Sequence, residues 1–136
     1  MLTIYTDGAS LGNPGPMGVG VVIYRGRMRI EELSEFIGEG TNNIAEYTAI
    51  MRALETARQL GENEVHVKSD SELVVRQMNG EYKVKDPKLR PLKRKIDSLC
   101  AGLEVHFEHI PREKNGEADR LSKEAAKRGR THQTVL

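Results

Sequence analysis

The chain has 136 residues, of which 38% are hydrophobic and 30% are charged, with 21 Lys and Arg residues against 20 Asp and Glu residues. This length fits one domain with one core, and the near-zero net charge provides no global field that attracts a polyanion. The single cysteine, Cys100, excludes an internal disulfide and a thiolate zinc cluster.

The first residues form no basic and apolar leader, and no apolar run approaches the ~20 residues that a membrane span needs. We therefore expect a soluble, cytoplasmic protein. No pattern in the chain indicates an obligate protein partner, so we expect a monomer.

The first third of the chain predicts three consecutive antiparallel strands. Alternating β-forming residues mark the strands, whereas Gly and Pro mark the turns, because Pro lacks a backbone donor and Gly carries an entropy cost. We expect Asp7-Gly8 to stop the first strand. The expected strands are residues 2–6, 19–24 and 28–37, with a turn region at residues 12–18.

The rest of the chain predicts four helices and two strands. Apolar residues three or four positions apart mark the helices, Gly61 stops the first of them, and Asp86-Pro87 gives the third a cap-plus-proline start. Residues 130–136 show no period and are expected to be loosely held. The expected helices are residues 44–60, 71–78, 86–102 and 115–127, and the expected strands are residues 65–69 and 103–110.

The order βββαβααβα predicts an α/β domain over residues 1–128, with a five-stranded mixed sheet flanked by helices, and a C-terminal tail at residues 129–136. The first and fourth strands can lie side by side and parallel, because a helix crosses between them. Ligands of such sheets bind beyond the carboxyl ends of the strands. Asp7 and Asp70 stand at two of these ends.

Four carboxylates stand at strand ends and helix starts, and each has a structural explanation when taken singly. Asp7 and the following glycine form a turn pair, and Glu46 completes a capping pattern with Asn43. Asp70 falls at a helix start, and Asp119 can pair with the lysine four residues later.

Taken together, the four carboxylates predict a metal site. Crowded acids repel one another and raise one another's pKa unless cations lie between them. Oxygen ligands without His or Cys suit hard ions such as Mg²⁺ or Mn²⁺. Two such ions can clamp the attacking and leaving oxygens of an in-line phosphoryl displacement.

Four motifs in this order resemble those of the type 1 ribonucleases H. The resemblance extends over residues 1–128 and implies the ribonuclease H-like fold. The motifs are residues 5–10 with 13–15, residues 41–46, residues 69–71 and residues 115–119.

The resemblance implies hydrolysis of the RNA strand of RNA/DNA hybrids, which leaves 5′-phosphate and 3′-hydroxyl ends. It further implies a DNA-strand phosphate contact for Thr41, although Glu39 replaces an Arg of some relatives. The implied ligands of two divalent ions, Mg²⁺ or Mn²⁺, are Asp7, Glu46, Asp70 and Asp119. The implied readers of 2′-hydroxyls in the minor groove are Gly8, Asn13, Asn42 and Asn43.

The chain departs from many relatives at two places. Residues 79–85 replace an extra helix and a basic protrusion, so the chain resembles a shorter archaeal and bacterial branch. Residues 111–114 replace a mobile loop with a histidine, and Arg112 is the nearest candidate to assist turnover electrostatically. The alternative for Arg112 is a phosphate contact or a surface ion pair with Glu113 or Glu117.

Histidines and lysines give weaker signals. His106 and His109 lie three apart on a strand and so point to opposite faces, which makes a zinc site from this pair unexpected. His109 could reach the acidic cluster, and His66 is expected to be solvated. The basic residues between positions 83 and 95 either contact the hybrid backbone or form a solvated helix face.

Two other functions stay open. A non-catalytic module could bind hybrids or double-stranded RNA, but a pure binder gains nothing from clustered acids beside phosphates. A nuclease with the same metal chemistry could cut double-stranded RNA or DNA instead. The asparagines and Gly8 favour a reader of 2′-hydroxyls and leave double-stranded RNA possible.

Overall fold

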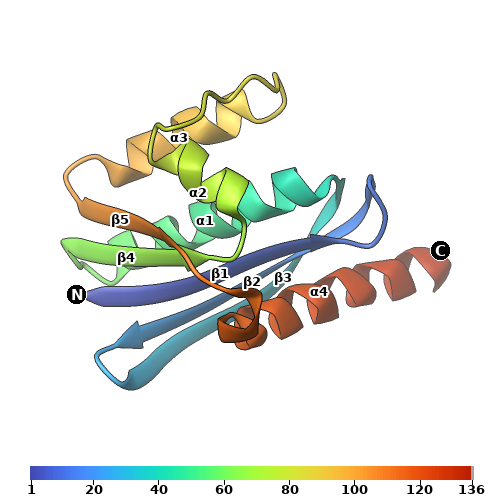
Figure 1. Ribbon diagram of the computed structural model, residues 1–136. Helices are drawn as coiled ribbons and strands as arrows, with labels where there is room; N and C mark the ends of the chain where they lie inside the picture. The colour runs from blue at the N-terminus through green and yellow to red at the C-terminus, as the bar shows by residue number, and fades with distance from the viewer. Residues whose placement is uncertain (136) are drawn as a thin grey trace.

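A five-stranded mixed sheet forms the centre of the protein, whose computed structural model describes the backbone of residues 1–135 and the side chains of residues 1–129 (Figure 1). The strand order is β3-β2-β1-β4-β5; β1, β2 and β3 pair antiparallel, whereas β1, β4 and β5 pair parallel. This confirms the predicted mixed sheet. The strands are β1 (Leu2–Ser10), β2 (Gly15–Arg25), β3 (Met28–Gly40), β4 (Glu64–Ser69) and β5 (Glu104–His109).

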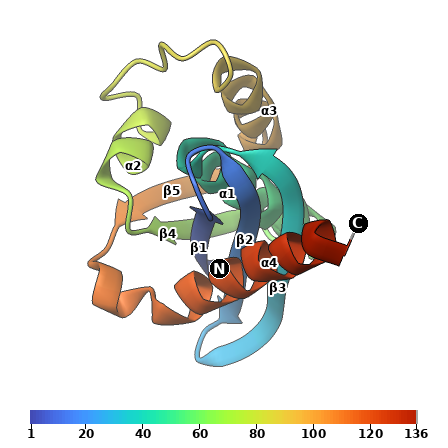
Figure 2. The same ribbon diagram turned by 90° about the vertical axis from the view of Figure 1, so that its right-hand side faces the viewer.

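Helices cover both faces of this sheet. α1 packs on β1 and β2 and carries α3 on its outer side, while α2 contacts the same face near β4 and β5. On the opposite face, Figure 2 shows α4 crossing β1, β2 and β3 while β4 and β5 lie to one side of it. None of the described helices is both long and apolar enough to cross a membrane. The helices are α1 (Asn42–Gln59), α2 (Glu72–Met78), α3 (Arg90–Cys100), the 3₁₀ turn η1 (Arg112–Lys114) and α4 (Gly116–Val135).

The main core lies between the sheet and α1. Alternate residues of β1 point toward α1, and Leu2 and Ile4 are fully buried there beside their β4 partners Val65 and Val67. Tyr47 of α1 is also fully buried, and its hydroxyl donates a 2.5 Å hydrogen bond to a side-chain oxygen of α2. The alternation of side chains along a strand leaves the intervening residues of β1 and β4 on the α4 side.

Two glycines of β2 allow α4 to lie directly on the sheet. A methyl group at Gly18 would lie 2.1 Å from the carbonyl oxygen of Ser122, and one at Gly20 would lie 2.1 Å from that of Ala118. Since both neighbours are helix backbone, a side chain at either position would push the first turns of α4 off the sheet.

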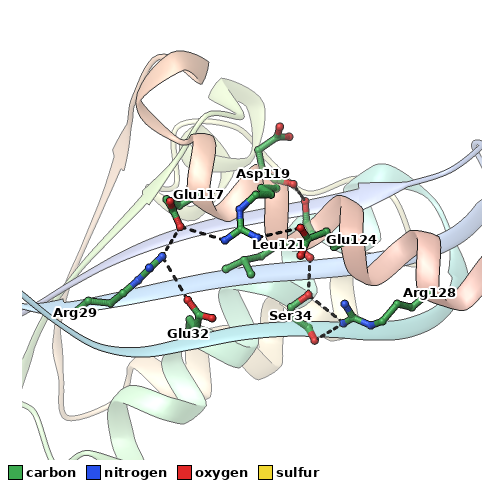
Figure 3. A network of polar contacts seen from close by, with 10 residues as sticks. Arg29, Glu32, Ser34, Glu117, Asp119, Leu121, Glu124 and Arg128 are labelled. Atoms are coloured by element: carbon green, nitrogen blue, oxygen red, sulfur yellow. Dashed lines mark hydrogen bonds and ion pairs between the residues drawn. The ribbon is translucent and has the colours of Figure 1, made fainter.

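Polar contacts with β3 fix α4 along its length (Figure 3). Ser34 donates a 2.7 Å hydrogen bond to the carbonyl oxygen of Leu121, and Arg128 donates one of 2.7 Å to the carbonyl oxygen of Ser34. Nearer the start of the helix, Arg29 pairs with Glu117. In Figure 3 the carboxylate of Asp119, which belongs to the same turn of α4, points away from this network.

The first strand is longer than predicted. Asp7-Gly8 does not stop it, because Asp7 pairs with Gly20 and Gly8 pairs with Val19 in an unbroken antiparallel ladder. The strand β2 likewise includes residues 15–18, which were expected to be a turn. Pro16 is accommodated near the start of that strand, beside a register shift between Pro16 and Gly18.

Two helix boundaries also differ from the prediction. α3 begins at Arg90 instead of Asp86, because the Asp86 carboxylate accepts a hydrogen bond from the Lys88 backbone and holds residues 87–89 in a separate turn. α4 continues to Val135 instead of ending at residue 127. A separate, loosely held tail stays a prediction, since the side chains of residues 130–136 lie outside the described part of the chain.

Candidate active site

Asp7 enters the site from the middle of the sheet. It lies on β1 with its side chain on the α4 side, and it is only 7% exposed. The hydroxyl of Ser122 on α4 lies 2.9 Å from Asp7 Oδ2 and 2.8 Å from the carbonyl oxygen of Asp119, so its single proton can serve either oxygen. The close approach of α4 therefore also positions the Asp7 carboxylate.

Asp70 follows the carboxyl end of β4 and is held by a buried asparagine. Asn115 precedes α4, is 1% exposed, and donates a 3.0 Å hydrogen bond to Asp70 Oδ2 and a 2.9 Å hydrogen bond to the carbonyl oxygen of Thr6. Its own side-chain oxygen is buried and meets no partner among the described residues. One amide thus joins β1, the end of β4 and the start of α4.

Glu46 reaches the site from the second turn of α1. The capping pattern predicted with Asn43 is wrong, because Thr41 is the N-cap and accepts a 3.3 Å hydrogen bond from the Ile44 backbone. The Glu46 carboxylate instead accepts a hydrogen bond from the backbone N–H of Gly8. The Glu46 carboxylate therefore contacts the backbone of β1 and does not cap its own helix.

Three of the predicted carboxylates converge in space. Ligand oxygens of Asp7, Glu46 and Asp70 all lie within 4.8 Å of one another. Burial raises the pKa of Asp7 to about 7 against a partial offset from the hydrogen bond with Glu46, and burial followed by the charge of Asp7 raises the pKa of Glu46. A cluster that resists full ionisation, and that offers only oxygen ligands, fits a bound divalent cation.

Asp119 stands beside these three residues at the start of α4 and outside their tight group. Its carboxylate lies 3.1 Å from the ammonium of Lys123, as the spacing of four residues predicted. All four carboxylates line one open cleft of about 460 Å³. The structure therefore brings the four predicted ligands to one cleft, where Lys123 pairs with Asp119.

Three of the five residues expected to contact substrate line this cleft. Gly8, Asn42 and Asn43 line it directly. Asn13 is not among the residues that line the cleft, but its side-chain oxygen accepts a 3.2 Å hydrogen bond from the Asn42 backbone. Thr41 caps α1 instead of lining the cleft, and its phosphate contact stays a prediction.

Basic residues also line the cleft. Arg112 is exposed on η1 and lines it, whereas His109 at the end of β5 does not. Lys123 and Lys127 of α4 also line the cleft, and sequence reasoning named neither as a site residue. Positive side chains along an acidic cleft suit a ligand that carries negative charge of its own.

Sequence reasoning also missed the two residues that hold the carboxylates. Asn115 stood in a recognised motif and Ser122 follows Asp119 by three positions, but neither was proposed for the site. Motif membership was the available signal for Asn115. No comparable signal marked Ser122, because its role depends on how closely α4 approaches β1.

A larger cleft of about 650 Å³ lies beside the start of α4 and includes Tyr5, Tyr24 and Lys68. It contains none of the four predicted metal ligands. The smaller cleft is the candidate active site, because it contains the carboxylates that could bind metal ions.

Comparison with known proteins identifies clear relatives. Residues 5–125 match the protein family described as Reverse transcriptase-like. Ribonuclease HI of Halobacterium salinarum is 42% identical over 123 residues, which cover 89% of this chain and 62% of that protein. Ribonuclease H of Desulforamulus reducens is 36% identical over 143 residues, which cover 93% of this chain and 87% of that protein.

A solved structure of LC11-RNase H1 in complex with RNA/DNA hybrid superimposes with a TM-score of 0.90 at 47% identity, covering 95% of this chain and 99% of that one. That protein was isolated from compost by a metagenomic approach. The chain spans only part of several relatives, including 62% of the Halobacterium protein and 35% of a Mycobacterium tuberculosis protein.

Proposed function

Because this chain belongs to the ribonuclease H family, we propose that it hydrolyses the RNA strand of RNA/DNA hybrids and leaves 5′-phosphate and 3′-hydroxyl ends. The observation that carries the proposal is the convergence of Asp7, Glu46 and Asp70, with Asp119 beside them, in one open cleft. The hybrid bound to LC11-RNase H1 supports this class of substrate.

Divalent metal ions are general cofactors of this family, and the four carboxylates are the residues that would hold them. Two ions, Mg²⁺ or Mn²⁺, would balance the four negative charges of Asp7, Glu46, Asp70 and Asp119. The chemistry that bound ions supply is activation of a water molecule and neutralisation of charge on the leaving oxygen.

The chain itself holds these carboxylates in place before substrate arrives. Gly8 donates to Glu46, Ser122 lies within hydrogen-bond distance of Asp7, and Asn115 donates to Asp70. The donors come from β1, from the residue before α4 and from α4 itself, so β1, α1 and α4 must pack correctly for the cluster to form. Such supporting contacts keep reacting groups oriented and reduce the cost of assembling the site.

The cleft rim supports recognition of the RNA strand. Gly8, Asn42 and Asn43 line it with backbone groups and short amides, which can hydrogen-bond to 2′-hydroxyls. Asn13 orders this rim through the backbone of Asn42, and the Asn42 side chain accepts a 2.8 Å hydrogen bond from the Ser10 backbone. We expect selectivity for RNA over DNA to depend on these contacts.

Positive side chains supply the remaining contacts with the hybrid. Arg112 lines the cleft and would stabilise charge or release the product phosphate, since a guanidinium keeps its proton at neutral pH. Outside the cleft, the basic residues of the α3 region are largely exposed, as in Lys85, Arg90 and Arg94. Contacts from these residues to the phosphate backbone would make binding depend on salt.

A catalytically silent binder of hybrids is the second candidate, and the acidic cluster disfavours it because unpaired carboxylates repel phosphates. Double-stranded RNA is a further possible substrate, since it also displays 2′-hydroxyls. For the protein as a whole we propose a monomer in the cytoplasm.

The test compares end-labelled RNA/DNA hybrid, double-stranded RNA and double-stranded DNA, each with Mg²⁺, Mn²⁺ or EDTA. We expect metal-dependent cutting of the RNA strand of the hybrid and no cutting of DNA. If the chain binds the hybrid but cuts none of the three substrates, it is a binding module and not a nuclease.

A further inference from the structure

A second group of metal-binding side chains lies on the sheet, away from the acidic cleft. The parallel strands β4 and β5 pair Glu64 with Glu104 and His66 with His106. Alternation along the strands places all four side chains on the α4 side of the sheet. Because α4 packs on β1, β2 and β3, this part of the sheet face stays open beside it (Figure 2).

The four side chains form a compact cluster. His66 Nε2 lies 3.1 Å from Glu64 Oε2, and His106 Nε2 lies 3.5 Å from Glu104 Oε2. The two imidazole rings have centroids 4.7 Å apart. Ligand atoms of Glu64, His66 and His106 all lie within 4.8 Å of one another. The side chains of His66 and His106 are 32% and 53% exposed, so an ion can reach them from solvent.

This cluster corrects two expectations. His66 is not simply solvated, since it contacts a carboxylate and a second imidazole. A zinc site was unexpected because His106 and His109 point to opposite faces, but the partner of His106 is His66 on the neighbouring strand. The pairing register of β4 and β5, which the sequence does not reveal, brings the two histidines together.

We propose that Glu64, His66 and His106, with Glu104 beside them, form a second cation site that binds Zn²⁺. Imidazole nitrogen together with carboxylate oxygen is a ligand set for Zn²⁺, whereas the oxygen-only acidic cleft suits Mg²⁺ or Mn²⁺. Zn–N bonds of ~2.0–2.1 Å in tetrahedral geometry place ligand atoms roughly 3.3 Å apart. Closing the group from its present spacing to that value requires rotamer changes, and the side chains are at least partly exposed.

The two sites are separate. His66 precedes Asp70 by four positions along β4 and its exit, which corresponds to roughly 13 Å at the rise of a strand. An ion at the second site would join β5, the edge strand, to β4 through side chains in addition to the backbone ladder. Because an ion that binds only the folded state raises stability, we expect Zn²⁺ to protect this edge from unfolding.

The first test follows the imidazole signals of the wild-type chain by NMR during a Zn²⁺ titration in excess Mg²⁺, which occupies the acidic cleft. The ring signals of His66 and His106 should shift together and saturate at one Zn²⁺ per chain, while those of His109 should not move. This measurement needs no variant and reads out binding without activity. Unchanged His66 and His106 signals at saturating Zn²⁺ would mean that the cluster is only a set of ion pairs and would overturn the proposal.

The second test measures Zn²⁺ affinity by calorimetry for His66→Gln, His106→Gln and the matched control His109→Gln, which shares β5 with His106. Loss of one ligand should weaken Zn²⁺ binding by at least about tenfold. Loss of a residue that only hydrogen-bonds to a metal ligand already weakens metal binding by about that factor. The control should bind as the wild-type chain does. Equal affinities in all three variants would assign the Zn²⁺ to another place and contradict the site.

Discussion

The backbone N–H of Gly8 on β1 donates a hydrogen bond to the side-chain carboxylate of Glu46 on α1, 38 residues later in the chain. The same glycine lets α1 approach the strand, since a methyl group at Gly8 would lie 2.2 Å from the carbonyl carbon of Ala45. The packing of α1 on β1 and the position of one predicted metal ligand therefore depend on one residue without a side chain.

The variant Gly8→Ala tests this relationship. The added methyl group has to displace α1 backbone, so we expect a loss of about 1–3 kcal/mol in the free energy of unfolding and a large loss of cleavage. Urea denaturation and the rate of hybrid cleavage measure the two effects. Gly116→Ala is the matched control, because a methyl group there meets nothing within 4 Å. Wild-type stability in Gly8→Ala would contradict the close packing.

The raised pKa of Asp7 predicts that the metal-free protein loses stability as pH rises. Burial lifts this pKa from 3.8 to about 7, so the folded state keeps a proton that the unfolded state releases within that window. An asparagine side chain does not titrate, so Asp7→Asn should be more stable than the wild-type chain in EDTA, by a margin that grows from pH 4 to pH 7. The full shift sets an upper bound of roughly 4 kcal/mol on that margin.

Urea denaturation in EDTA at several pH values measures the Asp7→Asn margin. Excess Mg²⁺ should shrink it, because the ion binds the charged carboxylate. The exposed aspartate Asp97 provides the control variant Asp97→Asn, which makes the same substitution away from the buried carboxylates. A margin for Asp7→Asn that is independent of pH would show that its carboxylate ionises as freely in the folded state as in the unfolded one.

Asn115 is predicted to support metal binding through Asp70. Asn115→Ala removes two hydrogen bonds from a buried amide, so we expect a loss of about 1–3 kcal/mol in stability. Calorimetry on the folded variant should also show Mg²⁺ affinity reduced by roughly 10–100-fold. Asn79→Ala, which removes one exposed amide contact with β5, is the control and should leave Mg²⁺ affinity unchanged. Unchanged affinity in Asn115→Ala would limit that residue to a structural role.

Lys123 is predicted to compete with a metal ion for Asp119. Its ammonium lies 3.1 Å from the carboxylate, and both side chains are partly exposed. Pairs of this kind contribute at most about 1 kcal/mol, so Lys123→Gln should lower the Mg²⁺ concentration for half-maximal cleavage by about two- to fivefold. Arg120→Gln breaks a similar pair on the same helix and should leave that concentration unchanged. A higher Mg²⁺ requirement in Lys123→Gln would mean that the lysine assists the site instead.

Local patterns predicted much of the fold. The apolar stripe of α1 and the crossover between β1 and β4 follow from residue spacing, and the parallel pairing of these strands confirmed the expectation. The length of β1 was not predictable, because Asp7-Gly8 is a turn signal by local preference. Tertiary contacts override it, since Gly20 pairs with Asp7 and α1 packs on Gly8.

The carboxylates of the candidate site could be predicted from the sequence, whereas the residues that hydrogen-bond to them were harder to predict. The order of strands and helices brings Asp7, Glu46 and Asp70 together, so they could be named from the sequence although Asp7 lies within β1 and not at its end. Ser122 could not, because its contact with Asp7 depends on the depth at which α4 lies on two glycines of β2. The pairing of His66 with His106 likewise depends on strand register, which no local pattern specifies.

The central claim is that the clustered carboxylates would hold the metal ions on which RNA cleavage depends, and Asp70→Asn tests it most directly. An asparagine can still accept the hydrogen bond from Asn115 through its carbonyl oxygen, so the fold and the cleft should survive while one ligand charge is lost. The measurement is single-turnover cleavage of end-labelled RNA/DNA hybrid in Mn²⁺, at enzyme concentrations that bind all of the hybrid. We predict full binding without detectable cleavage, and a variant rate within about tenfold of the wild-type rate would contradict the claim.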